Sequence, residues 1–223
     1  VTVTRPDRAG LAILISGRGS KMQACLDARS NGTLDADNRV VISNNPDAQG
    51  LQRAAAAGST ARCSDHRAYD SREAVDRALV EELQAHQVDL VILAGFMRIL
   101  TPLFLKPFAG RLLNIHPSLL PKYPGLHTHQ RALDAGDKEA GATVHFVTPE
   151  LDGGPPVIHA RVPVLPRDTA DTLAARVVVQ EHVIYPIAAQ WYVQGRLRLT
   201  EQGAYLDDNP IPPGGIQHTP GPH

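Results

Sequence analysis

Residues 11–20, LAILISGRGS, carry the pattern that decides the fold. Residues 11–15 are continuously apolar, with the length of a strand that is covered on both faces. A glycine turn follows at 17–19, and residues 21–29 then read as a helix. A buried strand that turns directly into a helix begins a strand–helix–strand unit, so this stretch predicts a parallel sheet with helices packed against it.

Strand and helix patterns alternate through the rest of the first half. Apolar runs at 39–43, 89–93 and around 112–116 predict three further strands. An alanine-rich segment that ends at Gly58 and a segment from about 70 to 87 are typical of helices. Because strands that alternate with helices pair in parallel, the sequence predicts an α/β fold with a doubly wound, mostly parallel sheet.

The second half has a different character. Residues 142–147 and 157–164 read as strands separated by only a short loop, which favours an antiparallel extension of the sheet. Residues 169–194 predict a long helix that Pro186 should bend or interrupt. Residues 207–223 are rich in proline and glycine, so we expect an irregular tail there.

Composition excludes several classes of protein. With 223 residues and 43% hydrophobic content, the chain can bury a large core, which excludes disorder throughout. A formal net charge of −1 gives no field for nucleic acid or anionic membranes. No apolar run approaches the roughly 18 residues of a membrane helix. Cys25 and Cys63 are too few for a disulfide framework. We therefore expect a cytoplasmic protein that binds neither nucleic acid nor membrane.

The segment at 111–125, RLLNIHPSLLPKYPG, has the most informative chemistry. Side chains two apart on a strand point the same way, so Asn114 and His116 should share one face while Ile115 turns inward. Pro117 cannot donate to a sheet ladder, so the strand should end there. An amide and an imidazole would then face one pocket. Taken alone, a buried histidine at a strand end would explain the same pattern.

Other polar residues also follow predicted strands. Ligands of open parallel sheets bind beyond the carboxyl ends of the strands, so one pocket could collect the glycine turn, residues 95–98 and the Asn114–His116 pair. The turn lacks the third glycine of a dinucleotide fingerprint and the Gly-Lys-Ser/Thr order of a nucleotide-hydrolysing loop. What remains suits one phosphate monoester at a helix N-terminus, with Lys21 adding charge. A tight turn without a ligand is the alternative.

Three further candidates can be weighed from the residues alone. Asp152 lies in a Leu-Asp-Gly-Gly-Pro turn, and its interest is as a carboxylate partner for His116. Glu181 lies inside a predicted helix, where a solvated face is the ordinary explanation. His127 and His129 have the spacing of two metal ligands on an extended segment, but no third ligand accompanies them, so we expect no metal site.

Three stretches together resemble one enzyme family. They read ISGRGSKMQA, AGFMRILTPLF, and LLNIHPSLLPKYPGLHTH with VHFVTPELDGGP after it. In this order and spacing they closely resemble the phosphoribosylglycinamide formyltransferases of de novo purine synthesis, from about residue 11 to residue 206. The resemblance implies a Rossmann-like formyltransferase domain over 1–206, with a nucleotide-phosphate half at 11–110 and a catalytic and folate half at 111–206.

The resemblance also implies three sets of site residues. The catalytic residues would be Asn114, His116 and Asp152. The ribonucleotide site would comprise Gly19, Ser20 and Lys21, together with Glu181 and the turn before it, Val178, Val179 and Gln180. The folate site would comprise Arg72, Met97, Arg98, Ile99, Leu100, Asn114, Thr148, Pro149, Glu150, Leu151 and Asp152. Lys21 stands where the family often has asparagine, and Pro149 stands where it often has an acid.

The implied reaction transfers a formyl group from the co-substrate 10-formyltetrahydrofolate to the amine of 5'-phosphoribosylglycinamide. Direct attack by the amine gives a tetrahedral intermediate with a negative oxygen. Asn114 and His116 would stabilise this oxyanion, and Asp152 would support the protonated form of His116. The resemblance implies small-molecule substrates, no metal, and a monomer or a homodimer.

Two other readings remain open. A formyltetrahydrofolate hydrolase or a methionyl-tRNA formyltransferase would share the same catalytic core. We expect neither, because the former usually carries an N-terminal regulatory domain and the latter a C-terminal tRNA-binding domain, which 223 residues do not accommodate. A non-catalytic nucleotide-binding module is the alternative from another class, and the presence of all three candidate catalytic residues argues against it.

Overall fold

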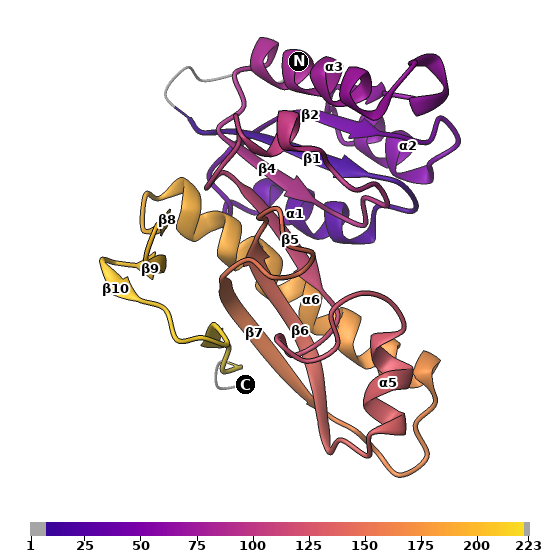
Figure 1. Ribbon diagram of the computed structural model, residues 1–223, viewed down its shortest axis with the longest axis vertical. Helices are drawn as coiled ribbons and strands as arrows, with labels where there is room; N and C mark the ends of the chain where they lie inside the picture. Colours follow the sequence, from indigo (N-terminus) through magenta and orange to yellow (C-terminus); the bar gives the residue numbers. More distant parts are fainter. Residues whose placement is uncertain (1–7, 221–223) are drawn as a thin grey trace. The chain divides into compact units, whose positions relative to one another are not determined.

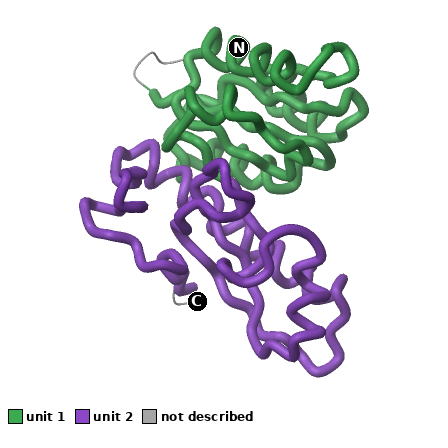
Figure 2. Tube along the Cα trace, viewed as in Figure 1, with its two compact units in different colours: residues 1–113 green, residues 114–223 purple. Residues whose placement is uncertain are grey.

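The computed structural model describes residues 8–220. Its Cα trace divides into two compact units, coloured green and purple in Figure 2. Unit 1 comprises Val1–Leu113, and unit 2 comprises Asn114–His223. The expected functional halves, 11–110 for the nucleotide phosphate and 111–206 for catalysis and folate, stay a prediction.

Unit 1 alternates strands and helices, as predicted. Its strands have the order β4-β1-β2-β3, and neighbouring strands run parallel. The elements are β1 (Gly10–Ile15), α1 (Ser20–Ser30), β2 (Asp37–Ser43), α2 (Gln49–Ala56), β3 (Ala61–Cys63), the 3₁₀ turn η1 (His66–Ala68), α3 (Arg72–Ala85), β4 (Leu90–Leu93), α4 (Pro102–Leu105) and the first residues of β5 (Leu112–His116).

The helices of unit 1 cover both faces of its strands. The chain moves outward from β1 to β3 through α1 and α2, and then returns through α3 to β4 on the other side of β1. Because such crossovers are right-handed, the reversal places α3 on the face opposite α1 and α2. Figure 1 shows α1 and α3 on opposite sides of the strands. Every residue of β1 is buried, which explains its unbroken apolar run. The predicted α/β fold class is confirmed.

Unit 2 contains the antiparallel extension. β6 and β7 pair antiparallel, with an irregularity of register between Val144 and His145, and α6 packs on both strands (Figure 1). β8, β9 and β10 form a separate small antiparallel sheet. Besides the end of β5, the elements are α5 (Thr128–Asp134), β6 (Glu139–Phe146), β7 (Pro156–Pro163), α6 (Ala170–Val193), β8 (Leu197–Thr200), β9 (Gly203–Leu206), β10 (Asn209–Pro210) and β11 (Ile216–Gln217).

Pro186 does not interrupt the long helix, and the alternative expectation of a bend there stays a prediction. α6 is one continuous helix of 24 residues that includes Pro186. A capping box formed by Thr169 and Thr172 fixes its start, and buried residues such as Leu173 and Ile184 recur along its length. An interior proline costs roughly 3 kcal/mol, whereas each fully buried aliphatic side chain contributes about 1.5–3 kcal/mol. Several buried side chains therefore outweigh the one defect.

Two short strands, β10 and β11, lie within the tail at 207–223 that was expected to be irregular. β11 pairs in parallel with β7, placing Ile216 opposite Ile158, and the backbone N–H of His218 donates to the His159 carbonyl at 2.8 Å. This pairing uses backbone groups alone, so it leaves little signal in a composition dominated by proline and glycine. Within residues 8–220, no helix is long and apolar enough to span a membrane.

Candidate active site

Asn114 and His116 lie on β5 with Ile115 between them. Strand alternation puts their side chains on the same side of β5. In the structure both approach one cluster, because Asn114 Nδ2 lies 3.4 Å from His145 Nε2 and His116 Nδ1 lies 3.5 Å from an Asp152 carboxylate oxygen. The structure therefore brings together the three residues predicted to be catalytic, all of them in unit 2.

The two ring nitrogens of His116 have different partners. Nε2 lies 2.7 Å from the carbonyl oxygen of Tyr123, and a carbonyl can only accept, so Nε2 carries a proton. Nδ1 faces Asp152 at 3.5 Å, which is longer than a normal hydrogen bond. The His116 side chain is only 7% exposed. Nδ1 is thus the nitrogen with room for a second acceptor.

Asp152 lies in the turn between β6 and β7. It adopts a positive φ of 51°, a conformation that aspartate tolerates better than most residues. Its Oδ2 accepts a hydrogen bond from the Gly125 N–H at 2.9 Å. The turn also depends on Gly154, because a Cβ there would lie 1.7 Å from the Phe146 carbonyl oxygen. Asp152 is therefore held both by its hydrogen bond and by close backbone packing.

His145, on β6, is a member of this cluster that the sequence analysis missed. It is 2% exposed, its Nδ1 lies 2.9 Å from the Phe146 carbonyl oxygen, and its Nε2 lies 3.8 Å from Asp152 Oδ1. Burial is the main cause that lowers the pKa of His145, and the nearby His116 lowers it further. The alternation used for Asn114 places His145 on one face of β6, but the register of β6 decides which residues that face meets.

The predicted phosphate loop has the geometry of a helix N-terminus. Gly19 precedes α1 with a φ of 77°, and its carbonyl accepts the N–H of Gln23. The loop is packed against α2, because the Gly50 N–H donates to the Gly17 carbonyl at 3.0 Å. Ser20 at the start of α1 is exposed. The loop therefore lies at the start of a helix, a position where first-turn N–H groups favour an anion.

A serine not predicted as a site residue fastens the strand ends of unit 1. Ser16 Oγ donates to the Asn44 side-chain oxygen at 2.6 Å and accepts from the Met97 N–H at 2.8 Å. These residues follow β1, β2 and β4, respectively. Since parallel strands end at one edge of a sheet, these two hydrogen bonds of Ser16 fix the loop at Met97 relative to the glycine turn.

The predicted folate residues of unit 1 lie along a cavity of about 330 Å³. Arg72, Met97 and Arg98 line it, together with His66 and Tyr69 among others. Arg98 forms an ion pair of 2.8 Å with Asp76, whose side chain is fully buried. Met97 and Ile99 are 76% and 69% exposed, whereas Leu100 is 8% exposed and packs inward. Arg72 and Met97 are therefore accessible to a ligand, whereas the Arg98 side chain is only 12% exposed and Leu100 supports the loop.

The other predicted binding residues belong to unit 2. Pro149, Glu150 and Leu151 are exposed in the loop before Asp152, while Thr148 is half-buried. Val178, Val179, Gln180 and Glu181 lie within α6, which agrees with the helix predicted at 169–194. Glu181 is 3% exposed, and Val179 is 58% exposed. The expectation that residues of both units line one pocket stays a prediction.

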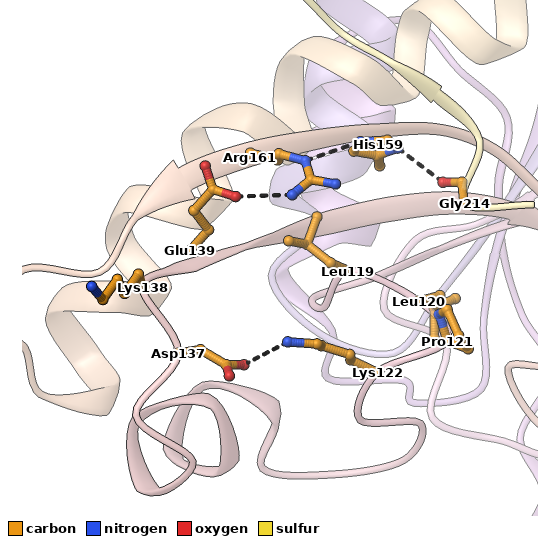
Figure 3. Close-up of a pocket in the computed structure, with 10 residues that line it drawn as sticks. All are labelled: Leu119, Leu120, Pro121, Lys122, Asp137, Lys138, Glu139, His159, Arg161 and Gly214. Carbon is orange, nitrogen blue, oxygen red and sulfur yellow. Dashed lines mark hydrogen bonds and ion pairs between the residues drawn. The ribbon is translucent and has the colours of Figure 1, made fainter. Parts of the chain in front are cut away.

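A second, larger cavity in unit 2 does not involve the predicted catalytic residues. It measures about 660 Å³ and is lined by residues 119–122, 137–139, His159, Arg161 and Gly214 (Figure 3). Four of its charged groups form two ion pairs: Lys122 pairs with Asp137 at 3.4 Å, and Arg161 pairs with Glu139 at 2.9 Å. These four groups offer a ligand little unbalanced charge.

The two histidines considered for a metal do not lie on an extended segment. His127 adopts a φ of 56° as the N-cap of α5, and His129 belongs to the helix itself. Across residues 8–220, no group of three histidine, cysteine or acidic residues is arranged to hold a metal ion.

Comparisons with known proteins agree with this geometry. A family model described as formyl transferase matches residues 9–189. The phosphoribosylglycinamide formyltransferase of Escherichia coli is 53% identical over 92% of this chain and 97% of its own. The structure of the Coxiella burnetii phosphoribosylglycinamide formyltransferase superposes with a TM-score of 0.91, at 41% identity, over 96% of this chain and 100% of its own. That of glycinamide ribonucleotide transformylase 1 from Symbiobacterium toebii gives a TM-score of 0.87, at 46% identity, over 91% and 95%. The prediction from resemblance is confirmed, and the chain belongs to the phosphoribosylglycinamide formyltransferase family of purine-biosynthetic enzymes.

Proposed function

We propose that this chain transfers the formyl group of 10-formyltetrahydrofolate to the amine of 5'-phosphoribosylglycinamide by direct attack, with Asn114 and His116 stabilising the oxyanion. The observation that supports the mechanism most is the cluster of Asn114, His116 and Asp152 within one unit. The amine nitrogen bonds to the formyl carbon, the bond from that carbon to N10 of the folate breaks, and the amine loses a proton as N10 gains one.

The oxyanion is stabilised by donors with a fixed direction. Asn114 supplies an amide N–H, and His116 supplies the N–H at Nδ1, the nitrogen whose distance of 3.5 Å to Asp152 leaves room for a shared acceptor. The other nitrogen stays on the Tyr123 carbonyl and holds the ring in place. Because these groups are fixed before reaction, little reorganisation is needed when the charge develops.

Substrate binding is assigned by the same resemblance. Gly19, Ser20 and Lys21 bind the ribonucleotide phosphate at the start of α1, where the first-turn N–H groups favour an anion. Glu181 and the three residues before it contribute to the ribonucleotide site from α6. The folate lies along Arg72, residues 97–100 and residues 148–152. The substrates are small molecules, and the chain acts in the cytoplasm.

The experiment that tests this function measures formyl transfer by the purified protein with and without the ribonucleotide. We expect consumption of 10-formyltetrahydrofolate only when phosphoribosylglycinamide is present, with formation of its formylated product. Equal consumption without the ribonucleotide would identify a formyltetrahydrofolate hydrolase instead. Absence of turnover, with the ribonucleotide still bound, would support the non-catalytic binding module.

The role of the Asp152 charge has its own test. In Asp152→Asn the side-chain oxygen can still accept from the Gly125 N–H, but the negative charge beside His116 is gone. We expect kcat to fall by roughly tenfold or more while the melting temperature stays close to that of the wild type, because the loop keeps its hydrogen bond. A wild-type kcat would refute the electrostatic role of Asp152.

A further inference from the structure

We propose that His145 is a positioning residue: its uncharged ring, protonated on Nδ1, holds the amide of Asn114 so that an N–H rather than the C=O faces the reacting formyl oxygen. The inference rests on the proposed role of Asn114 as an oxyanion donor. It deepens that role by explaining what decides which end of the amide is presented.

The protonation of the His145 ring follows from the Nδ1 partner. Nδ1 lies 2.9 Å from the carbonyl oxygen of Phe146, and a carbonyl can only accept, so the ring proton is on Nδ1. That carbonyl is held in place, because the Phe146 N–H donates to the Pro155 carbonyl at 3.0 Å and Gly154 packs directly on the carbonyl oxygen. The backbone thus fixes both the tautomer and the ring orientation.

Burial keeps the ring uncharged. It lowers the pKa of His145, and the neighbouring His116 acts in the same direction. The titratable groups that face the ring are His116 and Asp152, and the Asp152 carboxylate opposes the other two effects from 3.8 Å. In a neutral ring with a proton on Nδ1, Nε2 carries a lone pair and can only accept.

The lone pair then selects the end of the Asn114 amide. The Asn114 side-chain nitrogen lies 3.4 Å from Nε2 and can donate to it. A reversed amide would place its oxygen against the Nε2 lone pair, with no proton between two acceptors. One N–H of Asn114 is thereby directed to His145, and the second N–H of the same nitrogen remains for the oxyanion. A charged His145 would present an N–H instead and would favour the reversed amide.

The chain provides a matched control in His159. Like His145 it is a buried histidine with a lowered pKa, caused mainly by burial, and its Nδ1 lies 2.9 Å from a backbone carbonyl, that of Gly214. It lines the second cavity, whose lining does not include the predicted catalytic residues (Figure 3). Replacing His159 shows the effect of losing a buried histidine bound to a backbone carbonyl. Replacing His145 adds the loss of the contact with Asn114, so the two effects can be compared.

The kinetic test compares His145→Leu, His145→Gln and His159→Leu. We expect His145→Leu to lower kcat by about tenfold, the magnitude of one hydrogen bond, with both KM values nearly unchanged. His145→Gln should recover much of the loss, because its side-chain oxygen can accept from Asn114. His159→Leu should keep wild-type kcat. An equal kcat loss in both leucine variants would overturn the inference.

A double-mutant cycle separates this inference from the proposed mechanism. If His145 acts through Asn114, the substitution of His145 by leucine should lower kcat only slightly in an Asn114→Ala background. A tenfold loss in that background as well would overturn the positioning role and leave the mechanism intact. A wild-type kcat in Asn114→Ala alone would instead refute the proposed role of Asn114.

A spectroscopic measurement on the wild-type protein requires no leucine variant to fold. In long-range ¹⁵N–¹H spectra of histidine-labelled protein, the His145 resonances, identified by their loss in His145→Gln, should show a protonated Nδ1 and an unprotonated Nε2 at neutral pH. A protonated Nε2 would overturn the inference.

Discussion

Replacing Gly154 by alanine should damage catalysis from a position that touches no substrate. A Cβ at Gly154 would lie 1.7 Å from the Phe146 carbonyl oxygen, 2.8 Å from its carbon and 3.2 Å from Thr148 Cγ2. The first two are backbone atoms, so no side chain can rotate away, and the turn and β6 must separate by about 1.5 Å to reach van der Waals contact. That movement displaces Asp152 and the carbonyl that orients His145.

Two magnitudes follow from this displacement. A misplacement of about 1 Å in a preorganised site can cost roughly a hundredfold in rate, so we expect kcat of Gly154→Ala to fall by about that factor. Overpacking of this severity costs about 3 kcal/mol, which lowers the melting temperature by roughly 6–12 °C in a chain of this size.

The assay combines thermal unfolding with steady-state formyl transfer, and the formyl transfer is measured below the melting temperature of the variant. Gly214→Ala is the matched control, since a Cβ there meets nothing within 4 Å and its backbone is not in the left-handed region. It should keep wild-type kcat and stability. Wild-type kcat in Gly154→Ala would show that the turn does not hold the catalytic groups, and the reasoning from the close approach would fail.

Three other predictions concern the loop, the donors and the buried histidines. Gly19→Val should raise the ribonucleotide KM by at least about tenfold with little change for folate, because the new Cβ would lie 3.0 Å from Gly50 Cα at a positive φ; equal loss of both affinities would mean that the loop is only structural. Asn114→Ala and His116→Ala should each lower kcat by roughly a hundredfold, and the loss in the double variant should be smaller than the product of the two single losses. A loss equal to that product would show that the two residues act independently. Burial lowers the folded-state pKa of His145 and His159, so below the ordinary value of about 6.5 the unfolded state binds more protons than the folded state. The free energy of unfolding therefore decreases as the pH is lowered. Melting temperatures from pH 7.5 to 5 should therefore fall less steeply when both are replaced by glutamine, and an unchanged slope would contradict this.

Strands buried on both faces could be predicted from the sequence because their signal is local. β1, β2 and β4 appear as apolar runs within one or two residues of the predicted ends. β10 and β11 could not, because two residues of backbone pairing with a distant partner impose no pattern on side chains. Local rules also could not show that α6 continues past Pro186, since the burial of α6 is a tertiary effect.

The candidate site also contains residues that a local sequence pattern predicts and one that depends on the pairing of distant strands. Strand alternation alone placed Asn114 beside His116, because a period of two is a property of the strand. His145 was missed because its importance depends on which β6 residue faces β5 and on the direction of one carbonyl. Neither can be derived from a single chain without its register.

The two histidines of the site use opposite nitrogens to bind backbone carbonyls, and this makes Asp152 a shared partner. His116 engages Tyr123 through Nε2 and leaves Nδ1 toward the carboxylate at 3.5 Å, while His145 engages Phe146 through Nδ1 and leaves Nε2 toward it at 3.8 Å. Two imidazolium rings beside one carboxylate would repel each other, so the site favours only one. Burial lowers the pKa of His145, so the proposed mechanism places the positive charge on His116. In this proposal one histidine is the cation and the other is the neutral acceptor, a division of roles that environment rather than residue type imposes.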